Sequence, residues 1–417
     1  MDIAPQMHHV RFNFPAPRLD DPGQTLRGSL QEKRPMVPHG GKVGIAVGSR
    51  GIHNLKEIVA ETAAYIREMG AVPVIIPAMG SHGGATAEGQ QAVLAKFGVT
   101  EKDVGAAVES SMDTVVLGDT DGGVPIYFDK CASRLDGIVL LNRIKPHTDF
   151  HATYESGLVK QMVIGLGNHA GASEVHLHGL SGLKTLVPEM GEKVLEWARI
   201  LFGVAIIENA VDSTAEIHVL PKNSILEREP LLLQRAKELM PYIPFTGIDL
   251  LVVQEMGKNI SGVGMDSNIT GRRCIRRDLS GDDSGPARIV CLSLSAQSYG
   301  NALGVGMADV IPSSLYRAID FSVTYKNVIT SGFLERGFVP IVAGSEKEAI
   351  RIGIQCCGRK VDTHTARIVQ IKDTLSLREM YVSNSLLEDR EMSMDCEIGP
   401  EFTWEFSESE SLLSRLR

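Results

Sequence analysis

The sequence of 417 residues lacks any uninterrupted apolar run long enough to cross a bilayer as a helix, which takes about 18 residues. Its first residues, MDIAPQMHHVRFNF, also lack a basic region followed by an apolar stretch, the pattern of a secretory signal. These absences argue against a membrane-spanning helix and against export. They predict a protein of the cytoplasm.

Runs of lysine and arginine are also missing, and acidic side chains outnumber basic ones by 51 to 42, for a net charge of −9. An acidic chain without a basic run argues against nucleic acid or an anionic membrane as the main partner. We therefore expect a small molecule as the ligand.

The six cysteines lack the C-x-x-C spacing of zinc ribbons, and Cys356 and Cys357 are adjacent. This usage suits neither a structural zinc site nor a disulfide framework. We expect reduced thiols, most of them filling space in the core.

What the chain does contain is an alternation of short β-branched runs with helical patterns. The segment KVGIAV at 42–47 precedes apolar residues at helical spacing from Leu55 to Met69, and VPVIIP follows at 72–77. This order predicts a β-α-β unit. Asn54, followed three residues later by Glu57, resembles a capping box at the start of the helix. Further strands at 203–209 and 215–221 and a helix near 225–240 extend this first lobe.

A chain of this length exceeds one ordinary core, so two domains are expected. Pro241, Pro244 and Gly247 interrupt the pattern, which predicts domains at 1–246 and 247–417. The predicted fold class is α/β, with two lobes of mostly parallel sheets and an active-site cleft between them. The acidic, serine-rich end after residue 400 is expected either to be disordered or to fold back. The elements predicted for the second lobe are strands at 248–257, 287–295, 338–344 and 366–371 and a helix at 345–357.

Three polar loops follow predicted strands of the first lobe. Arg50 follows the strand at 42–47, His82 lies in the glycine-rich loop 80–84, and His147 follows the strand within DGIVLLNRIKPHTDF. Ligands of open α/β sheets bind outside the carboxyl ends of strands, so we expect these three side chains in one crevice. Arg50 there could bind a carboxylate or phosphate through two hydrogen bonds.

The stretch 142–179 holds five of the chain's 12 histidines. Imidazoles at this density serve as metal ligands or as proton carriers. A zinc protease of the HExxH type is not indicated, because Thr148 stands where that motif needs glutamate. Lys160 lies in the otherwise apolar run SGLVKQMVIGLG, which indicates a specific partner for its charge. The five histidines are His147, His151, His169, His176 and His178.

Two features of the second lobe stay open from the residues alone. Lys258 follows the strand at 248–257 and is either a surface lysine or a cation that faces the site. A basic cluster beside three aspartates is either a self-paired loop or an anion-binding one. This cluster consists of Arg272, Arg273, Arg276 and Arg277, with Asp278, Asp282 and Asp283.

Taken in order, these residues resemble the lactate racemase family. The family pattern has an arginine after the first strand, a histidine in a Gly-Thr-His loop, a Pro-His pair, a Ser-Gly-Gly-Arg-Lys segment and a later histidine. Here, too, that last histidine follows the lysine by sixteen residues. Lys258, in Gly257-Lys258-Asn259-Ile260, resembles the lysine of the family's Pro-Lys-Asp-Ile segment. The other counterparts are Arg50, His82, Pro146-His147, Ser156-Gly157-Leu158-Val159-Lys160 and His176.

The resemblance implies a nickel-pincer nucleotide, a modified nicotinate mononucleotide whose pyridinium ring carries two sulfur-bearing arms and binds nickel. It implies that Lys160 holds one arm through a thioamide, with Ser156 and Gly157 beside the cofactor. It also implies that His176 is the metal ligand, a role that suits imidazole with Ni(II). The implied activity is racemisation or epimerisation of a 2-hydroxy acid by proton-coupled hydride transfer through a keto intermediate.

This chemistry needs one base for each face of the substrate, and His82 and His147 are the predicted pair. Arg50 and Lys258 would anchor the substrate carboxylate. The family's glycine and arginine before the lysine are replaced here, which leaves His151 as an alternative to His147. Gln254-Glu255, where the family has small residues, indicates a substrate other than lactate.

Two other function classes remain open at this stage. The same histidines could serve a zinc- or iron-dependent hydrolase or lyase. Alternatively, the loops at 48–51 and 80–84 could bind an anion in a nucleotide- or phosphate-binding protein without catalysis.

Overall fold

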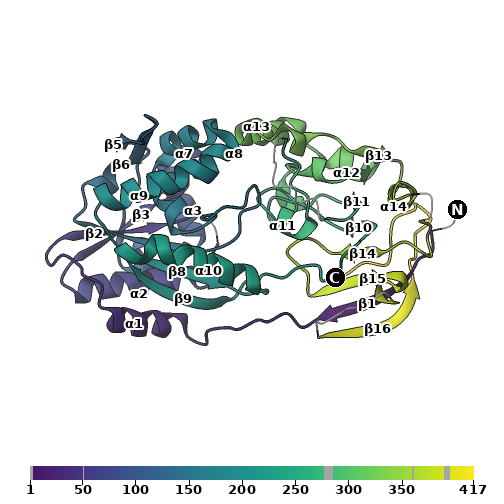
Figure 1. Cartoon of the computed structure of the whole chain (residues 1–417), viewed down its shortest axis with the longest axis horizontal. Coiled ribbons are helices and arrows are strands. Elements are labelled where there is room, and N and C mark those ends of the chain that lie inside the picture. The colour runs from purple at the N-terminus through teal and green to yellow at the C-terminus, as the bar shows by residue number, and fades with distance from the viewer. Residues whose placement is uncertain (1–2, 50, 277–284, 359–360, 389–394) are drawn as a thin grey trace. The chain divides into compact units, whose positions relative to one another are not determined.

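The computed structural model describes residues 3–49, 51–276, 285–358, 361–388 and 395–417. The chain forms two compact units, one of Pro15–Met240 and one that combines Met1–Phe14 with Pro241–Arg417. This division differs from the predicted domains 1–246 and 247–417, because the N-terminal strand joins the second unit. Strand β1 (Gln6–Phe12) pairs with β15 (Glu379–Ser383) and β16 (Cys396–Thr403), and Figure 1 shows it in purple between those two yellow strands.

The unit Pro15–Met240 is built on a six-stranded sheet in the order β4-β3-β2-β7-β8-β9. Its last strand is antiparallel and the others are parallel, and the predicted β-α-β unit is confirmed as β2, α2 and β3. Strands β2 and β3 are buried except at their first residues, as expected for strands covered on both faces. The strands are β2 (Lys42–Val47), β3 (Val72–Pro77), β4 (Ala107–Val108), β7 (Gly137–Arg143), β8 (Ile200–Glu208) and β9 (Thr214–Pro221).

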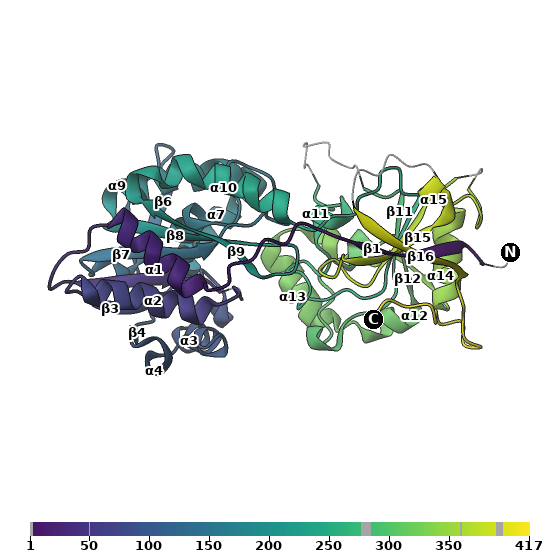
Figure 2. The same ribbon diagram turned by 90° about the horizontal axis from the view of Figure 1, so that it is seen from below.

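Helices cover both faces of this sheet. Ile45 and Val47 of β2 join one apolar core with α1 (Pro22–Lys33) and α2 (Leu55–Glu68), which lie side by side in Figure 2. Ala46 between them joins the opposite core with α9 (Val187–Trp197) and α10 (Ile225–Leu239), because successive side chains of a strand alternate in direction. The other elements of this unit are η1 (Gly83–Ala85), α3 (Ala87–Lys96), α4 (Glu101–Val104), β5 (Thr114–Asp119), β6 (Pro125–Asp129), α5 (Lys130–Ser133), α6 (Leu158–Lys160), η2 (Gln161–Gly165), α7 (Asn168–Leu177), α8 (Gly179–Ser181), η3 (Gly182–Leu186) and η4 (Lys222–Ser224).

The start of α2 differs from the predicted capping box. Asn54 has a φ of 61°, in the left-handed region, and its side chain caps no backbone N–H of the helix. Its Nδ2 instead donates to Glu57 Oε2 at 3.2 Å. Glu57 Oε1 accepts the N–H of Gly23 at 3.2 Å, so this pair connects α2 to the first turn of α1.

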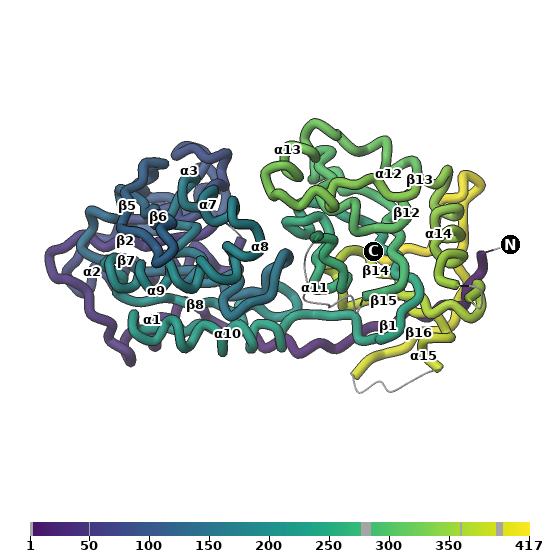
Figure 3. Tube along the Cα trace, turned by 45° about the horizontal axis from the view of Figure 1, so that its top comes forward, coloured from purple at the N-terminus to yellow at the C-terminus, as the bar shows by residue number. Residues whose placement is uncertain are grey.

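The second unit contains an eight-stranded sheet in the order β13-β12-β11-β10-β14-β15-β1-β16. Strands from β13 to β14 are parallel, and β15, β1 and β16 are antiparallel. Figure 3 labels β12, β13, β14, β15, β1 and β16 of this sheet along the Cα tube. The four predicted strands and the predicted helix are all present, with shorter bounds. The elements are β10 (Leu250–Val253), α11 (Ser267–Thr270), β11 (Arg288–Cys291), η5 (Ala296–Ser298), η6 (Val305–Met307), β12 (Val310–Pro312), α12 (Ser313–Ala318), α13 (Phe321–Ser331), η7 (Leu334–Gly337), β13 (Ile341–Ala343), α14 (Glu346–Gln355), β14 (Ile368–Ile371) and α15 (Asn384–Glu388).

The C-terminal end folds back onto this unit, which resolves the two expectations for the segment after residue 400. Gln254 Nε2 donates to the carbonyl of Leu416 at 3.1 Å, and its Oε1 accepts the N–H of Leu416 at 2.8 Å. Gln370 Nε2 also donates to Gln254 Oε1 at 2.8 Å. Gln254 is buried, so its amide serves the packing of the chain end, and it no longer supports the expectation of an unusual substrate.

All six cysteines are free thiols, as the sequence predicted. The expectation that most of them fill the core is wrong, because only Cys291 is buried, while Cys356 is exposed and the other four are partly exposed. Burial raises the pKa of Cys291 to about 12, which suits a core residue without thiolate chemistry. Across the described parts of the chain, no helix combines the length and apolar character that crossing a bilayer requires.

Candidate active site

The carboxyl ends of β3, β2 and β7 lie next to one another because these strands are neighbours in the parallel sheet. Gln161 spans this edge, since its Nε2 donates to the carbonyl of Ala46 in β2 at 3.0 Å and to that of Leu141 in β7 at 2.9 Å. The three loops that follow β2, β3 and β7 therefore leave from the same edge of the sheet, as expected of a ligand site in such a sheet. Arg50, one of the predicted residues, lies outside the described residues. The loops are 48–54, 78–86 and 144–157.

The loops after β2 and β3 touch through a side-chain hydrogen bond between Ser49 Oγ and His82 Nδ1. The N–H of Gly80 donates to the carbonyl of Gly165 at 3.0 Å, and the carbonyl of Gly80 accepts from Gln90 Nε2 at 3.0 Å. Gly80 has a φ of +59°, a conformation that favours glycine. His82 is thus placed by a loop that contacts both its neighbouring loop and the helical segment after β7.

The loop 144–157 is closed at its base, because Lys145 and Ser156 exchange backbone hydrogen bonds of 2.9 and 3.1 Å. Within it, the N–H of His147 donates to Glu155 Oε2 at 2.6 Å. The N–H of Asp149 donates to His147 Nδ1 at 3.0 Å. Both the backbone and the ring of His147 are therefore engaged with the loop itself.

Glu155 is the charged centre of this loop, and its side chain has no solvent-exposed surface. His151 Nδ1 lies 3.4 Å from its carboxylate, and Lys237 Nζ of α10 lies 2.8 Å from it. Burial raises the pKa of Glu155, whereas the hydrogen bonds from His151, Lys237 and the His147 backbone lower it. Together these hydrogen bonds outweigh burial, so the pKa lies below its usual value. Glu155 is therefore an anion at neutral pH.

Lys160 ends α6 and directly precedes a π-helical turn, η2, of the kind that is frequent at functional sites. Its Nζ lies 5.8 Å from the centroid of the Phe150 ring. That ring in turn lies beside His147, with 4.6 Å between the two ring centroids. The lysine in the apolar run thus meets an aromatic face, a contact that favours a cation.

His176, near the end of α7, lies within electrostatic reach of Lys160 and Asp149. Surrounding protein lowers its pKa by desolvation and the charge of Lys160 lowers it further, while the charge of Asp149 opposes both. The residue as a whole is nevertheless exposed to solvent. A lowered pKa keeps the imidazole neutral at neutral pH, the form that binds a metal.

The other histidines of the stretch do not join His176 in a cage of protein ligands. His178 Nε2 lies 3.7 Å from Glu174 Oε1 on the same helical stretch. Within the described ranges, no three side chains of His, Cys, Asp or Glu form a group placed to hold a metal ion.

The turn before Lys160 rests on Glu229, a fully buried residue of α10. Glu229 Oε2 accepts the N–H of Leu158 at 2.9 Å and that of Val159 at 3.0 Å. A Cβ at position 157 would collide with Glu229 Oε1, so Gly157 is required by packing. Because these two amides already bind Glu229, they are not available to a cofactor phosphate.

Replacing Glu229 by glutamine is expected to remove a pH dependence of stability. Burial raises the pKa of this carboxyl from 4.5 to about 7, against the two backbone hydrogen bonds. The folded protein then holds a proton that the unfolded chain has lost, so the free energy of unfolding falls between those pH values, by about 3 kcal/mol. Urea unfolding at pH 5 and pH 8 measures this, and equal pH dependence in the wild type and Glu229→Gln would contradict it.

Lys258, the predicted carboxylate anchor, belongs to the second unit and follows the carboxyl end of β10. Its N–H donates to Ser298 Oγ at 2.8 Å, and its Nζ donates to the carbonyl of Gly262 at 2.6 Å. These bonds place the ammonium group in its own loop. Its predicted contact with a substrate stays a prediction.

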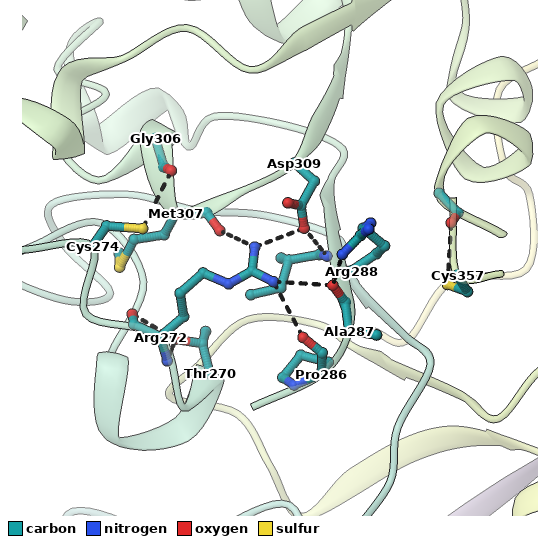
Figure 4. A network of polar contacts seen from close by, with 12 residues as sticks. Thr270, Arg272, Cys274, Pro286, Ala287, Arg288, Gly306, Met307, Asp309 and Cys357 are labelled. Carbon is teal, nitrogen blue, oxygen red and sulfur yellow. Dashed lines mark hydrogen bonds and ion pairs between the residues drawn. The ribbon is translucent and has the colours of Figure 1, made fainter. Parts of the chain in front are cut away.

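The basic cluster of the second unit is partly structural, as Figure 4 shows for Arg272. Its guanidinium binds the Asp309 carboxylate at 2.6 Å and the carbonyls of Met307, Pro286 and Ala287 at 3.1 to 3.3 Å. Arg276 pairs with Glu335 at 3.0 Å. These two arginines therefore pair with carboxylates outside the cluster, while Arg277, Asp278, Asp282 and Asp283 lie outside the described residues.

The sequence reasoning missed the residues that support the candidate site. Glu155, Glu229 and Lys237 carry no motif, and their contacts come from α10 on one side and the loop after β7 on the other. The one local signal was a charged residue, Glu155, directly before Ser156-Gly157. The partners of Glu229 lie 70 and 71 residues away in sequence, which no local pattern reveals.

By fold and site, this is an α/β protein of two units with histidines and one aromatic-packed lysine at the carboxyl edge of a parallel sheet. Residues 43–184 match the family model of the lactate racemase N-terminal domain. That range contains His82, His147, Lys160 and His176, so the resemblance to this family is confirmed over the region that carries most of its motifs, whereas Lys258 lies outside the matched range.

Two solved structures share the fold. The lactate racemase apoprotein from Thermoanaerobacterium thermosaccharolyticum is 12% identical with a TM-score of 0.53, over 88% of this chain and 94% of that one. A protein from Thermotoga maritima is 11% identical with a TM-score of 0.50, over 69% of this chain and 73% of that one. A comparison with curated protein sequences gave no match.

Proposed function

We propose that this protein is a racemase or epimerase of a 2-hydroxy acid that uses a nickel-pincer nucleotide. The observation that carries the proposal is that Lys160 and His176, sixteen residues apart in sequence, lie close enough for the lysine charge to lower the pKa of the imidazole, within the region that matches the lactate racemase domain. The acidic charge of the chain supports a small molecule as substrate and no nucleic acid as partner. The lack of a long apolar run in the sequence supports a location in the cytoplasm.

The residues fit such a cofactor. Lys160 offers an amine that can form a thioamide, and His176 offers an imidazole kept neutral by its surroundings and by the lysine charge. One imidazole suits Ni(II) when carbon and sulfur ligands come from the cofactor. When bound, the cofactor would supply the acceptor and donor of hydride for C2 of the substrate.

The protein's own groups would move the hydroxyl proton. His82, with Ser49 against its Nδ1, is one proton carrier, and a histidine of loop 144–157 is the other. Imidazole suits both directions of a racemisation because its pKa lies near the working pH. Arg50 and Lys258 remain the proposed anchors of the substrate carboxylate.

Analysis of the holoprotein tests the cofactor. Intact mass should show an adduct that peptide mapping places on Lys160, and metal analysis should find nickel. Zinc or iron without an adduct would overturn the proposal in favour of a hydrolase or lyase. Neither metal nor adduct, with retained binding of a nucleotide or phosphate, would favour a non-catalytic binding protein.

Isotope retention tests the reaction. One enantiomer of a 2-hydroxy acid, incubated with holoprotein in heavy water, should be inverted while C2 keeps its original hydrogen, because hydride does not exchange with solvent. The substrate for this experiment is first found by screening a panel of chiral hydroxy acids and sugar acids. Full incorporation of deuterium at C2 would indicate carbanion chemistry and contradict the proposed mechanism.

A further inference from the structure

His147 and His151 lie on the same loop but engage their Nδ1 atoms in opposite ways. His147 Nδ1 accepts the N–H of Asp149 at 3.0 Å, and the carboxylate oxygen nearest to it, Asp149 Oδ2, lies farther away at 3.8 Å. A neutral imidazole has one N–H and one lone pair, so the proton of neutral His147 lies on Nε2. Its lone pair is used by the loop backbone.

His151 Nδ1 faces the opposite kind of partner. It lies 3.4 Å from both carboxylate oxygens of Glu155. An ionised carboxylate only accepts hydrogen bonds, so Nδ1 of His151 carries the proton and Nε2 keeps its lone pair. A general base needs this lone pair.

The state of Glu155 is secured by its other partners. Lys237 Nζ lies 2.8 Å from Oε1, and the His147 N–H lies 2.6 Å from Oε2. Both donors favour the anion, and the pKa of the carboxyl is correspondingly lowered despite burial. An ion pair with Lys237 therefore maintains the acceptor that His151 faces.

Exposure separates the two histidines in the same direction. The side chain of His151 is 39% exposed and that of His147 is 16% exposed. The ring with the available lone pair is thus also the more accessible one.

We propose that Glu155 is a positioning residue that fixes His151 in the Nδ1–H tautomer, so that His151, not His147, is the proton acceptor of loop 144–157. A carboxylate in this role orients the ring and fixes its tautomer, as it does for catalytic and metal-binding histidines in general. That the acceptor acts on a substrate hydroxyl rests on the proposed function, whereas the tautomer and the accessibility of the lone pair do not.

The first test uses the wild-type full-length chain without cofactor. Nitrogen-15 imidazole shifts should show protonation at Nδ1 for His151 and at Nε2 for His147 at a pH where both are neutral. Diethylpyrocarbonate, which acylates a free imidazole lone pair, should modify His151 several-fold faster than His147, as measured by peptide mass spectrometry. Opposite tautomers, or faster modification of His147, would overturn the proposal without any variant.

The second test replaces Glu155 by glutamine. The carboxamide oxygen can still accept the His147 N–H, but its NH₂ group can donate to His151 Nδ1, which allows the opposite tautomer. Modification of His151 should slow several-fold. Glu174→Gln is the matched control, because it makes the same change at a carboxylate that lies 3.7 Å from His178 and outside loop 144–157, so His151 should keep its tautomer. An unchanged His151 in Glu155→Gln would contradict the proposal.

Turnover provides a separate readout. In the active holoprotein, Glu155→Gln should lower kcat by about 10²- to 10⁴-fold with a smaller change in KM, as expected when a general base is lost. His151→Gln should match it. A wild type with the expected labelling pattern but no racemisation of any hydroxy acid would count against the proposed function and leave the Glu155 assignment standing. Full turnover in His151→Gln would overturn the assignment of His151 while leaving that function intact.

Discussion

Replacement of Lys160 by methionine is expected to abolish both racemisation and the cofactor-derived mass of the holoprotein. Methionine matches the length and apolar character of the lysine stem, so it can keep the packing against Phe150 while it removes the amine. The proposed thioamide cannot form without that amine, and the hydride acceptor is then lost altogether. Intact mass, nickel content and chiral analysis of the product measure the three consequences.

Lys193→Met is the matched control for this variant. Lys193 lies in the same unit and pairs with Asp121 at 2.8 Å, but Asp121 is 88% exposed, so this ion pair contributes little to stability. The control should keep the adduct, the metal and the turnover. An adduct that persists in Lys160→Met would mean that the cofactor is attached elsewhere or is not covalently bound.

Replacement of His176 and of His82 by glutamine is expected to separate metal binding from proton transfer. His176→Gln should lose nickel, because the amide is a poor substitute for a neutral imidazole, while the mass on Lys160 remains. His82→Gln should keep both nickel and adduct and lose kcat by about 10²- to 10⁴-fold, the range for removal of a general acid-base group. Metal analysis and steady-state kinetics on both variants make the comparison.

Equal loss of nickel in the two variants would show that the assigned roles are wrong. Circular dichroism and urea unfolding of each variant exclude loss of folding as the cause. For His82 the relevant contact is Ser49, so Ser49→Ala should change kcat less than His82→Gln does, since alanine leaves the imidazole in place.

The strands and their order along the chain could be predicted because each is a short apolar run with a turn after it. The segments 42–47 and 72–77 coincide with β2 and β3, and the intervening helix begins at Leu55 as expected. Parallel strands bring their carboxyl ends to one edge, so the contact between Ser49 and His82 follows from the same pattern. Local periodicity was therefore sufficient to predict these strands and the helix between them.

The N-terminal strand could not be placed in this way. Residues 6–12 have no local feature that distinguishes pairing with a neighbouring segment from pairing with residues 379–403. Hydrogen bonds between strands depend on which segments meet in the folded chain, and the sequence separation here spans almost the whole protein. The prediction therefore assigned this segment to the unit that follows it in sequence.

The sequence by itself determined the chemistry available to this protein: the lysine in an apolar run, the histidine sixteen residues later, and the polar loops after successive strands. Only the tertiary structure decided how those groups are held. Glu229 and Lys237 reach the loop and the lysine turn from α10, and Glu155 separates two histidines that look alike in sequence. The reason is physical: a tautomer or a pKa depends on which charges and donors surround a group in space, and these come from segments far apart in the chain.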